Sequence, residues 1–145
     1  MVYVGELVTT GGCLCGAVRY ESRGEPLAQL ICHCRDCQRA SGTGVVPIMA
    51  VPKIDFRVMG ETIGFAIEGG SGKRAIRHFC PHCGSLLFGT PEVAPQMVTI
   101  YVGSLDDSRT FDPKYAQFAR TKPAWCGASI PEHDTIPSLP RSGAN

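Results

Sequence analysis

The spacing of the cysteines limits what this chain can fold into more than any other feature. Seven of the eight fall into three short groups: Cys13-x-Cys15, Cys32-x-Cys34-x-x-Cys37 and Cys80-x-x-Cys83. Neighbours this close rarely form disulfides with one another, because a disulfide requires particular Cα separations, but they converge readily on one metal ion. The first residues show no basic region followed by an apolar stretch, as a secretory signal would. We therefore expect a cytoplasmic metal protein rather than a secreted disulfide framework.

The bulk composition narrows the class of protein further. Lys and Arg number 14 against 13 Asp and Glu, a net charge of +1, which argues against a nucleic-acid binder that works through bulk electrostatics. No apolar run approaches the roughly 20 residues that a membrane-spanning helix needs. A length of 145 residues leaves room for one modest core. We expect a single zinc domain over residues 1–145, with residues 136–145 as a frayed tail.

The pattern of apolar residues predicts a mainly β chain with little helix. The 17 glycines and 11 prolines separate short apolar runs, which is typical of many strands joined by turns. Alternating polarity predicts strands, and a helical turn is expected in a single place. The predicted strands are 17–21, 44–51, 53–58, 62–68, 74–79 and 97–102, and the helical turn is 36–41. Pro47 predicts that its strand lies at an edge or carries a bulge.

Two of the cysteine groups look like the halves of one closed metal site. Each has the form of a zinc knuckle, since a glycine, Gly16 or Gly84, follows its last cysteine and a strand comes next. Two knuckles with two thiolates each complete the tetrahedral coordination of structural zinc. The ligands predicted for this site are Cys13, Cys15, Cys80 and Cys83. The alternative that Cys15 binds a metal together with the middle group stays open.

The middle group, Cys32, Cys34 and Cys37, predicts a second and more open site. In an extended segment Cys32 and Cys34 face one side while His33 faces the other, and Cys37 follows on the same face if a helix begins there. Three protein ligands with one position left for substrate are typical of catalytic zinc. The candidates for a closing fourth ligand are Cys126, His78, His82 and His133, and the candidates for contacts to an anionic substrate are Arg35, Gln38 and Arg39.

The motifs together resemble one known family. They are GGCLCGAVRY at 11–20, CHCRDCQRASG at 32–42, FCPHCG at 79–84 and GSLDD at 103–107. In this order they resemble the glutathione-dependent formaldehyde-activating enzymes, the GFA or CENP-V/GFA domain family. The resemblance implies a tent-like fold of several coiled antiparallel sheets with little helix. It also implies a structural zinc on the two knuckles and a second zinc on the middle group.

The resemblance also implies an activity. It is that of a zinc-dependent carbon–sulfur lyase, which condenses a glutathione-type thiol with formaldehyde or another small aldehyde to an S-hydroxymethyl adduct. The middle cysteines would then be catalytic, and the partners would be small molecules rather than nucleic acid or membrane. Two alternatives remain: a non-catalytic zinc scaffold that binds a partner protein, and a redox sensor whose second site loses its zinc and oxidises. Monomer and homodimer both stay open.

Overall fold

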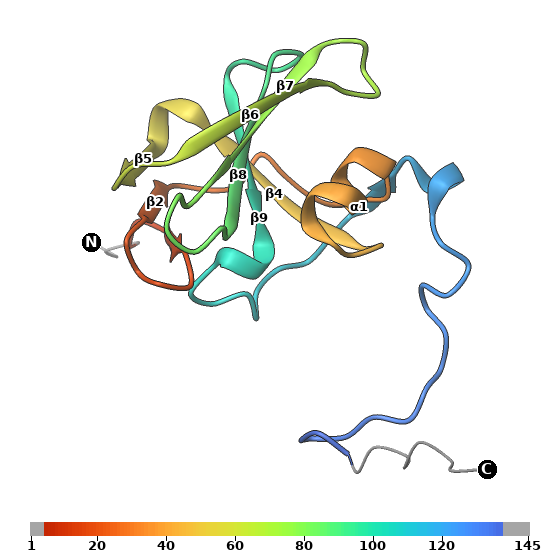
Figure 1. The fold of residues 1–145 in the computed structure, drawn as a ribbon. Coiled ribbons are helices and arrows are strands. Elements are labelled where there is room, and N and C mark those ends of the chain that lie inside the picture. The colour runs from red at the N-terminus through yellow and green to blue at the C-terminus, as the bar shows by residue number, and fades with distance from the viewer. Residues whose placement is uncertain (1–4, 138–145) are drawn as a thin grey trace, which may run out of the picture.

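The computed structural model describes residues 5–137. Most of the expected frayed tail, residues 138–145, lies outside this part, and the single domain over 1–145 stays a prediction. Within the described part, Pro123 and Trp125 still lie against Gly44, and the chain toward residue 137 then extends away from the sheets (Figure 1, blue). No described helix is long and apolar enough to cross a membrane.

The described chain forms two β-sheets and little helix (Figure 1). The smaller sheet has the order β1 (Val8–Gly12), β2 (Arg19–Arg23), β5 (Phe56–Met59). The larger has the order β10 (Tyr115–Gln117), β3 (Ala28–Cys32), β4 (Val46–Pro52), β9 (Met97–Tyr101), β8 (Leu86–Pro91), β7 (Arg74–Phe79), β6 (Ile63–Glu68). The helices are α1 (Arg35–Ser41) and the 3-10 turns η1 (Lys53–Asp55), η2 (Val102–Ser104) and η3 (Ala119–Thr121).

The expected mainly β fold of antiparallel sheets with little helix is confirmed, and the larger sheet carries one parallel pair in addition. Its edge strand β10 pairs with β3 in parallel, with Tyr115 opposite Leu30 and Gln117 opposite Cys32. The sheet is therefore mixed. The parallel pair has a consequence for the site, because it places residues that follow β10 beside the end of β3.

Alternation predicted several elements well. Val98 and Ile100 of β9 are 2% and 0% exposed, and Val102, which begins η2, is 4% exposed, as expected for the buried face of the strand predicted at 97–102. The strands predicted at 62–68 and 74–79 are present as β6 and β7, which form a hairpin and pair antiparallel from Ile63↔Phe79 to Glu68↔Arg74. The helical turn predicted for 36–41 is α1.

Two strand predictions need correction. The segment predicted as a strand over 53–58 begins with the 3-10 turn η1, and β5 starts only at Phe56. Pro47 lies in β4, a central strand rather than an edge. The pairing of β4 with β9 begins at Ile48↔Tyr101. Pro47 therefore lies beyond the β9 ladder, where its missing N–H removes no bond to that strand.

Buried side chains form two clusters, and each one holds one of the cysteine groups in place. The larger cluster contains Cys13 and Cys80 together with Val18, Tyr20, Met49, Val51, Leu87, Phe88, Val98, Ile100 and Val102. The smaller cluster contains Cys32 and Cys37 with Leu30, Val46 and Ile48. Apolar burial thus fixes the backbone that presents the thiols.

Candidate metal centres and the adjoining cavity

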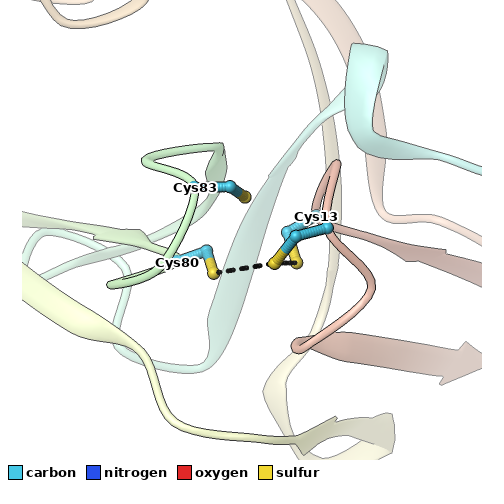
Figure 2. A group of neighbouring side chains, drawn as sticks. Cys13, Cys80 and Cys83 are labelled. Atoms are coloured by element: carbon cyan, nitrogen blue, oxygen red, sulfur yellow. Dashed lines mark hydrogen bonds between the residues drawn. The ribbon is translucent and has the colours of Figure 1, made fainter.

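The two knuckles meet and bring four thiols together. The sulfurs of Cys13, Cys15, Cys80 and Cys83 all lie within 4.8 Å of one another, and Figure 2 shows the two chain segments facing each other across them. The Sγ–Sγ distance is 3.6 Å for Cys13–Cys15 and 3.8 Å for Cys15–Cys80. Zinc–sulfur bonds of about 2.3 Å in a tetrahedron separate the sulfurs by about 3.8 Å. This four-cysteine group fits one zinc ion, and Cys15 belongs to it rather than to the middle group.

The same backbone turn builds both halves. In each, the amide of the first cysteine donates to the carbonyl five residues later, Cys13 to Val18 and Cys80 to Ser85, both at 3.0 Å. The glycine after the last cysteine has a left-handed φ, 82° at Gly16 and 73° at Gly84. Because glycine adopts this region without steric cost, it allows the chain to turn back at once.

Backbone amides and one hydroxyl surround these sulfurs. The amide of Val18 donates to Cys13 Sγ at 3.2 Å, and that of His82 donates to Cys80 Sγ at 3.4 Å. Ser85 joins the halves, because its Oγ lies 3.1 Å from Cys83 Sγ and accepts from the Leu14 amide at 3.0 Å. Such N–H groups stabilise thiolates and orient them for a metal. The sequence reasoning missed Ser85.

The end of β3 and the start of α1 bring together the middle thiols, here called the three-cysteine group. The sulfurs of Cys32, Cys34 and Cys37 lie within 4.8 Å of one another. Cys32 is the last residue of β3, and Cys34 is the N-cap of α1. The Cys34 sulfur accepts a hydrogen bond from the Cys37 amide at 3.3 Å. A cysteine therefore serves as the helix cap, and the first helical turn carries Cys37 back to the same sulfurs.

None of the described residues completes this group as a fourth histidine, cysteine or carboxylate ligand. His33 points away from it, as strand alternation predicts, and its buried ring places Nδ1 2.9 Å from the Gly44 carbonyl oxygen. The other candidates for closing the site also stay outside the group; they are Cys126, His78, His82 and His133. Three sulfurs suit zinc, which then has one position for an exogenous ligand.

The three adjacent thiols shift one another's pKa values in opposite directions. Hydrogen bonding to Cys34 and Cys37 lowers the pKa of Cys32 far below its ordinary value, whereas hydrogen bonding to Cys32 raises the pKa of Cys37. One thiolate therefore forms easily while the others keep their protons. A divalent metal ion would supply the positive charge that three adjacent thiolates require.

A cavity of about 260 Å³ opens onto the three-cysteine group. The cavity is lined by the three cysteines and by Asp36 of α1. It is also lined by residues 69–71 between β6 and β7, by strands β7 to β9 and by the end of β10. The lining side chains that can form hydrogen bonds include Arg77, Thr90, Thr99, Tyr101 and Gln117. The Nη2 atom of Arg77 lies 3.5 Å from Cys37 Sγ. Burial raises the pKa of Tyr101 to about 12, so its phenol stays a hydrogen-bond donor at neutral pH.

The side chains predicted to contact substrate lie elsewhere. Gln38 is buried, and its amide nitrogen donates to the carbonyls of His33 at 2.8 Å and Thr121 at 3.0 Å. Its oxygen accepts from Arg35 at 2.8 Å. Arg39 is exposed in the last turn of α1, and none of the three predicted contacts lines the cavity. Gln38 instead fastens α1 to the segment after β10.

The sequence reasoning missed the residues that do line the cavity opposite the sulfurs. Arg77 falls in a strand that was predicted correctly, and Tyr101 is on the predicted strand β9. Alternation can place such residues on one face of a strand. It cannot say that this face meets the three-cysteine group, whose Cys37 lies 40 residues before Arg77 in the sequence.

The fold and the thiol clusters define a class: a mainly β protein with two cysteine groups that can hold zinc. The family model described as glutathione-dependent formaldehyde-activating enzyme, GFA, matches residues 8–121, and the chain belongs to this family. None of the curated proteins matches the chain. A crystal structure of a Rhodobacter sphaeroides protein has the same fold, with a TM-score of 0.56 at 24% identity over 74% of this chain and 98% of that one.

Proposed function

We propose that this chain is a zinc-dependent enzyme of the carbon–sulfur lyase type, which joins a glutathione-type thiol to a small aldehyde. The observation that carries the proposal is the three-cysteine group, whose sulfurs converge without a fourth described protein ligand and open onto a cavity. Membership in the GFA family supports the choice of thiol and aldehyde. Closed structural zinc sites lack such an opening.

The reaction needs few groups from the protein. The thiol loses its proton, its sulfur forms a bond to the aldehyde carbon, and the carbonyl oxygen gains a proton to give the S-hydroxymethyl adduct. Zinc held by Cys32, Cys34 and Cys37 would supply Lewis acidity, which favours the thiolate form of a bound thiol. Nothing is oxidised or reduced, and the reverse reaction releases the aldehyde.

The cavity offers a group for the oxygen end of the aldehyde. The Tyr101 hydroxyl is protonated at neutral pH, because burial raises its pKa to about 12. It lines the same cavity as the three sulfurs, and a neutral phenol can donate a hydrogen bond to an oxygen that gains charge. We assign Tyr101 this role in the proposed reaction. The cavity lies below the roughly 300–1,000 Å³ of ordinary ligand pockets, which suits the reacting end of a thiol better than a whole tripeptide.

Exchange spectroscopy by NMR tests the proposal. The zinc-loaded protein is expected to speed the exchange between formaldehyde, glutathione and their adduct, and Cys34→Ser is expected to return the rate to that without protein. Cys126→Ser is the matched control, since Cys126 lies outside both cysteine groups, and it should keep the full rate. Equal exchange rates for the wild type and Cys34→Ser contradict the proposal.

A further inference from the structure

The charge of Arg77 is unusual for its surroundings. It is half-buried and is the single cationic side chain among the described residues that line the cavity. None of the ion pairs formed by the described residues includes it, and its Nε is buried with no partner among them. Burial of a guanidinium is unfavourable unless nearby groups compensate its charge. The contact that can do so is the Cys37 sulfur, 3.5 Å from Nη2.

The neighbouring strand leaves space beside this guanidinium. Residue 89, directly opposite Arg77 on β8, is glycine. A Cβ there would lie 2.6 Å from Thr99 Oγ1, so no other residue fits without displacing that hydroxyl. Gly89 and Thr99 both line the cavity. The absence of a side chain at this position keeps the cavity open next to the cation.

The net charge at the three-cysteine group shows which kind of ligand the positive charge of Arg77 favours. Three thiolates around one divalent ion carry a net charge of minus one, which the charge of Arg77 offsets. Asp36 also lines the cavity, but its carboxylate forms no ion pair with Arg77 among the described residues. A thiolate that enters as the fourth ligand restores a negative charge, and the guanidinium beside it offsets part of the repulsion. A neutral ligand of the same size gains no such benefit. An arginine keeps its charge throughout the working pH range.

We propose that Arg77 is a positioning residue that makes the three-cysteine group select thiolates over neutral nitrogen or oxygen ligands. Its guanidinium bonds to Cys37 Sγ through one nitrogen and presents another to the entering sulfur. The thiol releases its proton to the solvent as it binds, so one proton appears for each thiol bound. This inference rests on the proposed function, because it names the ligand class of the same site.

Calorimetric titration of the zinc-loaded protein at pH 8 tests the proposal, with 2-mercaptoethanol as the anionic ligand and imidazole as the neutral one. Arg77→Met is expected to weaken thiol binding at least about tenfold and to change imidazole binding by less than about twofold. Arg77→Lys should recover part of the thiol affinity, since it keeps the charge but loses the fork of donors. Repeating the titration in buffers of different ionisation enthalpy counts the proton released.

Arg74→Met is the matched control. Arg74 starts the same strand, is exposed and pairs with Glu92, so its loss removes the same charge without touching the cavity. Both ligands should bind this variant as they bind the wild type.

Several outcomes overturn the inference. Thiol binding that is unchanged in Arg77→Met, or that weakens as much for imidazole as for thiol, shows that Arg77 has no selective role. If Arg77→Met fails to retain zinc, Arg77→Lys decides: an equal loss for both ligands contradicts the proposal, and a loss confined to the thiol supports it. A wild type that binds imidazole but no thiol refutes the proposed function itself, which separates the two failures.

Discussion

Single residues decide whether each cysteine group is built correctly. Gly84 shows this most clearly, because its φ is 73° and a Cβ placed on it meets nothing within 4 Å. The glycine is needed for backbone conformation rather than for space. At the open site, Cys34 combines two roles, since it caps α1 with its sulfur and lies in the three-cysteine group. The chemistry and the local fold therefore depend on the same atoms.

The first prediction concerns this backbone strain. Gly84→Ala should lower the free energy of unfolding of the zinc-loaded protein by about 1 kcal/mol, because alanine is disfavoured in the left-handed region. Gly103→Ala is the control, as a Cβ there also meets nothing within 4 Å and its φ is not left-handed. Urea denaturation measures both, and equal stability of the two variants would show that the turn imposes no strain.

The second prediction concerns Tyr101. Tyr101→Phe removes the hydroxyl that lines the cavity and should slow formaldehyde–glutathione exchange by about 10- to 100-fold while leaving thiol affinity unchanged. Because the pKa of Tyr101 is raised to about 12, its proton is kept below that pH and the wild-type rate should show no loss from its ionisation up to pH 10. Tyr115→Phe, at an exposed position in β10, should behave as wild type. A rate for Tyr101→Phe equal to that of the wild type contradicts the role.

At the scale of elements, the three-cysteine group depends on how α1 is fastened to the segment after β10. The parallel pairing of β10 with β3 brings η3 beside the end of β3. There the Thr121 hydroxyl donates to the His33 carbonyl at 2.7 Å, and the Gln38 amide donates to His33 and Thr121. These bonds hold His33, which lies between Cys32 and Cys34, and they hold the start of α1, which carries Cys37.

The third prediction tests this fastening. Gln38→Ala removes the side-chain donor to the Thr121 carbonyl and one of the two side-chain donors to the His33 carbonyl. The loss should cost about 1 kcal/mol of unfolding free energy and should speed the release of metal from the three-cysteine group. Arg39→Ala, on the exposed side of the same helix, should stay within about 0.5 kcal/mol of the wild type. Urea denaturation and the rate of zinc transfer to a chelator measure the effects. Faster zinc release in Arg39→Ala than in Gln38→Ala would contradict this assignment.

At the scale of the whole molecule, the four-cysteine group joins the two sheets. Cys13 and Cys15 follow β1 and Cys80 and Cys83 follow β7, so one ion there would tie the smaller sheet to the larger. Binding of Cys15 and Cys80 to the same ion would close a loop of 65 residues, counted from one cysteine to the other. Closure of a loop this long removes much entropy from the unfolded chain. The three-cysteine group makes no such connection, because its ligands come from a single short segment.

The fourth prediction is a two-step removal of metal. The purified protein should hold about two zinc ions per chain, and a chelator should take the ion of the three-cysteine group first, with the fold retained. Removal of the second ion should unfold the chain, because the stability it supplies is lost with it. Metal analysis with circular dichroism follows both steps. Two ions that resist the chelator equally, in a protein that binds no thiol, favour the non-catalytic scaffold over the enzyme.

The sequence by itself determined the local parts of this protein. Cysteine spacing and the glycines after the knuckles predicted which thiols come together. Alternation predicted β9, the strands β6 and β7, and the side of the chain on which His33 lies. All of these depend on near neighbours in the chain. The tertiary structure decided what lies across from the sulfurs. Strand pairing in the larger sheet brings Arg77 and Tyr101 to the cavity. Gln38 donates hydrogen bonds to backbone carbonyls, one of which belongs to Thr121, 83 residues away in the sequence. Contacts over such separations depend on sheet order and register, which no local pattern encodes.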